Sequence, residues 1–91
     1  MTYQLIYTDS YNKRAKKFLR KHPEIHNQYR KTLQLLELNP FHPSLRLHGL
    51  EGRLKELSSV SINMSYRIVL ELEIKEGEIV LINVDRHDCV Y

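Results

Sequence analysis

The chain has 91 residues, a length typical of one compact domain, so we expect a single domain over residues 1–91 with an open site rather than a deep cofactor cavity. Hydrophobic residues make up 42% and charged residues 27%, and no apolar run approaches the roughly 18 residues of a membrane span, which excludes membrane insertion. The first residues lack the features of a secretory signal, and one cysteine, Cys89, provides neither an intrachain disulfide nor a cysteine-based zinc site. We therefore expect a cytoplasmic protein.

The net charge of +3 is unevenly distributed along the chain. Residues 1–48 hold nine Lys/Arg and three Asp/Glu, whereas residues 49–91 hold five and eight. The first half therefore carries +6 and the second half −3. This division, with a pI near 9.1, predicts that the first half binds a polyanion such as nucleic acid or an acidic protein.

The first half of the sequence predicts a strand followed by two helices. Residues 2–8 are β-branched and aromatic, and Asp9-Ser10 then supply N-cap residues. Apolar residues at helical spacing continue to His22-Pro23, where the first helix should stop. A second helix should begin at Pro23-Glu24 and end at Asn39-Pro40, which makes a helical hairpin.

After residue 44 the hydrophobic period changes to two, so the rest of the chain should form a sheet. Its strongest strand is residues 66–74, and Lys75-Glu76-Gly77 turns it into residues 78–84, a strand that we expect to be buried on both faces. The predicted order is β-α-α-β-β-β-β. We therefore expect an α+β fold in which the helical hairpin packs on one face of a mainly antiparallel four- to five-stranded sheet.

A dense basic cluster lies on the first predicted helix. It exceeds the nearby acidic residues, so it can follow a line of phosphates, although a solvated helix face is the ordinary alternative. These RNA-binding candidates are Lys13, Arg14, Lys16, Lys17, Arg20 and Lys21.

Arg67 lies in the strongest predicted strand, on the face opposite Ile68 and Leu70. A guanidinium in such a position needs a carboxylate or a phosphate. It can pair with Glu71 or Glu73 on its own face, or it can bind a phosphate of a substrate.

His48 and His87 are candidates for proton transfer, because each lies near the end of a predicted strand and histidine titrates near neutral pH. Exposed turn histidines are the alternative, and we assign His22, His26 and His42 to that class. A metal site made of His42, His48 and His87 is not expected, since no ligand spacing of a known type is present.

Lys55 and Tyr91 complete the candidate set. Lys55 can act as a second cation at a phosphate or be an ordinary surface lysine, and Tyr91 can stack on a base or fill an apolar gap. We interpret Cys89 as a small buried residue rather than a nucleophile.

Three segments, in this order, give the sequence a resemblance to a known family. They are Leu47-His-Gly-Leu-Glu-Gly-Arg-Leu-Lys-Glu-Leu57, Ser65-Tyr-Arg-Ile-Val69 and Val84-Asp-Arg-His-Asp-Cys-Val-Tyr91. With the basic first helix and the order of elements, they resemble the RelE/ParE superfamily of bacterial toxins over essentially the whole chain, and most closely the RelE/YafQ-type mRNA interferases. The resemblance implies a cytoplasmic endoribonuclease that cuts mRNA on the ribosome, needs no cofactor, and is silenced by a cognate antitoxin in a hetero-oligomer.

The resemblance also carries site residues, and it leaves alternatives open. Two serines, Ser61 and Ser65, stand where the YafQ branch has a further His and Asp. The alternatives are a ParE-like inhibitor of DNA gyrase that cuts nothing, and a plain RNA-binding module. For a nuclease, metal-independent attack of a ribose 2′-OH on its own 3′-phosphate needs a proton acceptor, a proton donor and cations. The residues that match the family's site are His48, Lys55, Arg67, His87 and Tyr91.

Overall fold

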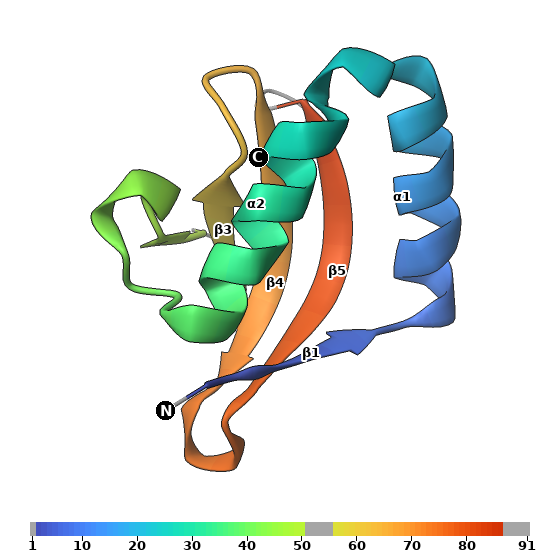
Figure 1. Ribbon diagram of the computed structural model, residues 1–91. Helices are drawn as coiled ribbons and strands as arrows, with labels where there is room; N and C mark the ends of the chain where they lie inside the picture. The colour runs from blue at the N-terminus through green and yellow to red at the C-terminus, as the bar shows by residue number, and fades with distance from the viewer. Residues whose placement is uncertain (1, 51–55, 87–91) are drawn as a thin grey trace.

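The computed structural model describes residues 2–50 and 56–86 of the chain, and its elements follow the predicted order (Figure 1). Short 3-10 turns lie at Pro23–Ile25, Pro43–Leu45 and Ile74–Glu76. None of the described helices is long and apolar enough to cross a membrane. The strands and helices are β1 (Gln4–Tyr7), α1 (Asp9–Lys21), α2 (His26–Leu38), β2 (His48–Gly49), β3 (Ser58–Ser61), β4 (Tyr66–Glu73) and β5 (Glu78–Arg86).

The strands form one five-stranded sheet with the order β1-β5-β4-β3-β2. β1 runs parallel to β5, and every other neighbouring pair is antiparallel. Both helices pack on the same face of this sheet, with α1 beside β5 and α2 across the middle strands (Figure 1). The predicted α+β fold is therefore confirmed.

The main core lies between the helices and one face of the sheet. Tyr11 of α1 and Leu36 of α2 are fully buried there, against Ile68, Leu70 and Leu81 of the central strands. Burying a large apolar side chain contributes about 1.5–3 kcal/mol, so this face holds the two layers together. Among the described residues, a smaller apolar cluster on the opposite face of the sheet consists of Leu50, Leu57, Val69 and Ile82.

A bulge in β5 decides which of its side chains face the core. Val69 pairs with Asn83 but Leu70 pairs with Leu81, so Ile82 is the extra residue. Leu81 and Val84 therefore both face the helices, although they are three residues apart and would lie on opposite faces of a regular strand. The prediction that β5 is buried on both faces was wrong in part, because Ile82 on the other face is only half-buried.

Two boundaries differ from the sequence prediction. Thr8, rather than Asp9-Ser10, caps α1: its side-chain oxygen accepts a hydrogen bond from the Tyr11 N–H at 3.1 Å, and its hydroxyl donates to the Leu81 carbonyl at 3.3 Å. The sheet resumes at His48 rather than at residue 45, because Leu45 is buried in a 3-10 turn that Arg46 closes in a left-handed conformation with φ 50°.

The turn between β4 and β5 also differs. Ile74, predicted as the end of a strand, lies in a 3-10 turn and is exposed. Gly77 ends this turn with φ 67°, a conformation that glycine adopts without steric cost.

Candidate functional site

Arg67 lies on the sheet face away from the helices, as predicted, and its side chain is held by backbone and side-chain oxygens. Its Nε donates to the Ser59 hydroxyl oxygen at 3.0 Å, and its Nη2 donates to the Arg46 carbonyl at 3.1 Å. Arg67 is 7% exposed and Ser59 is fully buried. These bonds fix the guanidinium in one orientation across β3 and β4.

The structure brings His48 beside this guanidinium. His48 lies on β2 opposite Ser59 of β3, and its Nδ1 is 3.5 Å from Arg67 Nη2. The His48 residue itself is exposed. Two of the five predicted catalytic residues, 19 positions apart in sequence, are therefore neighbours on one face.

The alternative pairing of Arg67 with its strand neighbours does not form. Among residues 2–50 and 56–86, Arg67 forms no ion pair with Glu71 or with Glu73. Both carboxylates lie further along β4, beyond Val69 on the same face. Of the two alternatives for Arg67, the ion pair with Glu71 or Glu73 is therefore not the arrangement that the described residues form.

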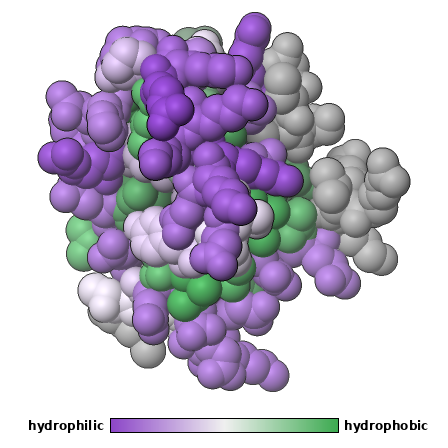
Figure 2. Space-filling model, turned by 90° about the vertical axis from the view of Figure 1, so that its right-hand side faces the viewer, coloured by the Kyte–Doolittle hydropathy of each residue, from purple (hydrophilic) through white to green (hydrophobic). Residues whose placement is uncertain are grey.

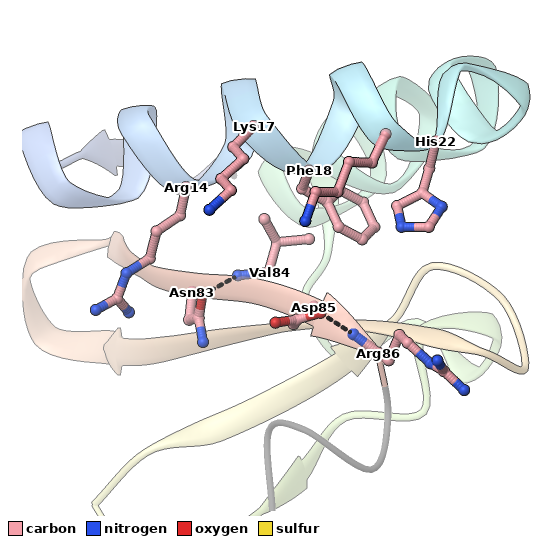
Figure 3. Close-up of a pocket in the computed structure, with 9 residues that line it drawn as sticks. Arg14, Lys17, Phe18, His22, Asn83, Val84, Asp85 and Arg86 are labelled. Atoms are coloured by element: carbon pink, nitrogen blue, oxygen red, sulfur yellow. Dashed lines mark hydrogen bonds between the residues drawn. The ribbon is translucent and has the colours of Figure 1, made fainter.

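A groove of about 550 Å³ lies between α1 and the end of β5 (Figure 3). β1 pairs with β5 over residues 78–81, and the groove lies between α1 and the part of β5 beyond these residues. Side-chain oxygens of Asn83 and Asp85 accept hydrogen bonds from the N–H groups of Val84 and Arg86 at 2.9 and 2.8 Å. The residues that line the groove are Arg14, Lys17, Phe18, Lys21, His22, Asn83, Val84, Asp85 and Arg86.

All six basic candidates of α1 are exposed, and Figure 2 shows the hydrophilic surface that covers this side of the molecule. They form two rows with the same composition. One row lines the groove and consists of Arg14, Lys17 and Lys21. The other row, which does not line the groove, consists of Lys13, Lys16 and Arg20. The structure therefore divides the predicted cluster into a groove row and an outer row.

His22 was predicted to be an exposed turn histidine, and this was wrong. Its side chain is 24% exposed, and its Nδ1 lies 3.1 Å from the Tyr66 hydroxyl. The ring also contacts Phe18 and Tyr66, with centroids 4.9 and 4.8 Å away and ring planes tilted by 48° in both pairs. The i,i+4 spacing of Phe18 and His22 on one helix face was the signal in the sequence. His26 and His42 are exposed, as predicted.

Three predicted catalytic residues, Lys55, His87 and Tyr91, lie outside the described residues, as does Cys89. Their roles stay predictions. In the part of the chain that the structure describes, no group of three or more His, Cys, Asp or Glu side chains is placed to hold a metal ion.

The sequence matches no protein-family model, and no curated protein matches it significantly. Solved structures do match. YafQ from E. coli strain BL21(DE3) superposes with a TM-score of 0.78 at 15% identity, over 98% of each chain. The toxin–antitoxin complex RelBE2 from Mycobacterium tuberculosis matches with a TM-score of 0.73 at 18% identity, over 96% of this chain and 100% of that one. A YoeB/ParE toxin from Agrobacterium tumefaciens matches with a TM-score of 0.70 at 17% identity, over 92% of this chain and 98% of that one.

The chain has the RelE/ParE-type toxin fold. Within this fold, Ser61 and Ser65 build the turn before β4. The Ser61 hydroxyl donates to the Asn63 carbonyl at 2.6 Å, and the Ser65 N–H donates to Asn63 Oδ1 at 2.8 Å. At these two positions, where the resemblance expects a His and an Asp, the loop is stabilised by the Ser61 side chain and by the Ser65 backbone N–H.

Proposed function

We propose that this protein is the toxin of a type II toxin–antitoxin system and acts as a ribosome-dependent mRNA endonuclease, an mRNA interferase. The observation that carries the proposal is the pair formed by His48 and Arg67 on the sheet face away from the helices, with Nδ1 and Nη2 3.5 Å apart in a RelE/ParE-type fold. An exposed imidazole next to a fixed guanidinium suits a phosphodiester substrate.

The proposed reaction is an internal transfer at phosphorus. The ribose 2′-oxygen attacks its own 3′-phosphate, the bond from phosphorus to the 5′-oxygen breaks, and the products are a 2′,3′-cyclic phosphate and a 5′-hydroxyl. One proton leaves the 2′-oxygen and one reaches the 5′-oxygen. His48 and His87 are the candidates for the proton acceptor and the proton donor. Arg67 and Lys55 are the candidates for stabilising the charge on the phosphorane, and Tyr91 is the candidate for contact with a base. No cofactor is needed for this chemistry.

The basic face of α1 supports binding to RNA. Six exposed cations on one helix provide phosphate contacts without base specificity, which suits ribosomal RNA and mRNA backbones. Because the sheet face with Arg67 and the α1 face are different surfaces, the protein can hold the ribosome with α1 and present His48 to the mRNA.

A cognate antitoxin is the proposed partner. The solved RelBE2 structure is named as a toxin–antitoxin complex. We expect an acidic or amphipathic segment that folds on binding, neutralises the groove row of α1 and covers Arg67, in a toxin–antitoxin hetero-oligomer.

The deciding experiment adds purified protein to translating ribosomes with a defined mRNA and locates cuts by primer extension. A gyrase supercoiling assay runs on the same sample. Cuts that end in a 5′-hydroxyl support the proposal. Intact mRNA with loss of supercoiling would overturn it in favour of a gyrase inhibitor, and RNA binding with neither effect would favour a plain binding module.

A further inference from the structure

The contacts of Arg67 determine which nitrogen of His48 carries a proton. A guanidinium only donates hydrogen bonds, so a ring nitrogen that faces it must offer a lone pair. Arg67 Nη2 faces His48 Nδ1 at 3.5 Å. The neutral ring in this arrangement therefore carries its hydrogen on Nε2, since the tautomer is set by what the other nitrogen faces.

Ser59 determines where that guanidinium lies. Its hydroxyl oxygen accepts a hydrogen bond from Nε, while the Arg46 carbonyl accepts one from Nη2. Ser59 is fully buried, and His48 is its register partner across β2 and β3. Removing the hydroxyl would take away the acceptor that Ser59 offers to Nε and let the planar group tilt away from His48.

We propose that Ser59 is a positioning residue that holds Arg67 against Nδ1 of His48, so that His48 presents its Nε2–H as a hydrogen-bond donor to the substrate phosphate. The assignment rests on the proposed nuclease function for its substrate. In this arrangement His48 stabilises charge on a phosphate oxygen and does not accept the 2′-OH proton. The proton that leaves the 2′-oxygen is then taken up by another group, for which His87 is the candidate, and the protonated group gives it to the departing 5′-oxygen.

The tautomer can be measured without any activity. Histidine ring ¹⁵N shifts distinguish a protonated nitrogen from one with a lone pair, and His48→Gln identifies the His48 signals. At neutral pH we expect an unprotonated Nδ1 and a protonated Nε2. A protonated Nδ1 would overturn the proposal.

Ser59→Ala is the test of the positioning role, with Ser58→Ala as its control. Ser58 is the neighbouring residue on the same strand, and its pairing with Leu70 places it on the opposite face. In folded Ser59→Ala we expect the ¹⁵N shifts of His48 to show a mixture of tautomers. In Ser58→Ala the shifts should match those of the wild type. Wild-type ¹⁵N shifts of His48 in folded Ser59→Ala would overturn the positioning role of Ser59.

Kinetics give a second readout. Ser59→Ala should lower kcat by roughly 10- to 100-fold with little change in KM, because a misplaced Arg67 guanidinium and His48 ring weaken stabilisation of the transition state more than substrate binding. Ser59→Thr keeps the hydroxyl and should recover most of the rate. Equal rates for Ser59→Ala and wild type would contradict the proposal.

His48→Gln covers the case in which Ser59 variants do not fold, since His48 is exposed. A glutamine amide can place an N–H near the position of Nε2–H, so His48→Gln should keep more activity than His48→Ala and retain the wild-type pH profile. Equal losses, or loss of one limb of the profile, would assign proton transfer to His48 and overturn the donor role. If the wild type cuts no RNA, the nuclease function fails while the ¹⁵N result still decides the Arg67–His48 arrangement.

Discussion

The hydroxyl oxygens of Tyr11 and Tyr29 lie 2.6 Å apart in the core and join α1 to α2. Burial is the main cause that raises the pKa of both phenols above the ordinary value of about 10. Tyr29 adds to the rise in the pKa of Tyr11, whereas the hydrogen bond from Tyr11 offsets part of the rise for Tyr29. The helix hairpin therefore depends on two neutral phenols.

This pair predicts a loss of stability at alkaline pH. Because the folded-state pKa values exceed the unfolded ones, the contribution of the phenols is complete below about pH 10 and falls as the pH rises further. Urea unfolding at pH 7 to 11 should show the free energy of unfolding declining above pH 10. A double Tyr11→Phe, Tyr29→Phe variant is the comparison and should decline less. An identical decline in both proteins would contradict the prediction.

Arg67→Ala should affect both catalysis and stability. Loss of transition-state charge stabilisation costs about 3 kcal/mol, or roughly 10²-fold in rate, while ribosome binding should fall much less. The change also leaves Ser59 and the Arg46 carbonyl without this donor, at a cost of about 1–3 kcal/mol. Cleavage and thermal melting should be measured on the same samples, below the melting temperature.

His87→Ala, at a position outside the described residues, should lower the rate by roughly 10²- to 10⁴-fold if it supplies the acid or base. Full cleavage by a folded Arg67→Ala, His87→Ala double variant would end the catalytic assignment of both residues.

The two rows on α1 allow a matched test of RNA binding. Each row holds one Arg and two Lys, so changing either row to Gln removes the same charge. If groove geometry matters, the change at Arg14, Lys17 and Lys21 should weaken binding more than the change at Lys13, Lys16 and Arg20. The salt slope should become shallower by about one unit for each phosphate that the variant no longer binds. Equal effects would assign binding to net charge, and unchanged affinity in both would assign this helix to solubility.

Expression of the protein alone should be toxic, and co-expression with a neighbouring antitoxin gene should remove the toxicity. The antitoxin should protect the groove row from lysine modification, because an acidic segment binds there by charge complementarity. Free growth on expression, with no neighbour that co-purifies, would remove most of the support for a toxin.

Cleavage should continue in excess EDTA, wherever the ribosome is kept intact or naked RNA serves as the substrate. The proposed chemistry uses protein side chains for proton transfer and charge stabilisation. A strict requirement for added zinc or manganese on free RNA would contradict the mechanism.

The sequence by itself determined the order of elements, the basic face of α1 and the face on which Arg67 lies. These features depend on local patterns, namely the period of apolar residues and the stop signals at His22-Pro23 and Asn39-Pro40. Local patterns extend over a few residues, so they can be read directly from the chain.

Only the tertiary structure decided what surrounds Arg67. Ser59, Arg46 and His48 come from other segments, and the strand register brings them to one guanidinium. A bulge at Ile82 decides which side chains at the end of β5 face the helices, and the packing of α1 beside the end of β5 forms the groove. Register and strand length result from packing between distant segments, and no local period in the sequence encodes them.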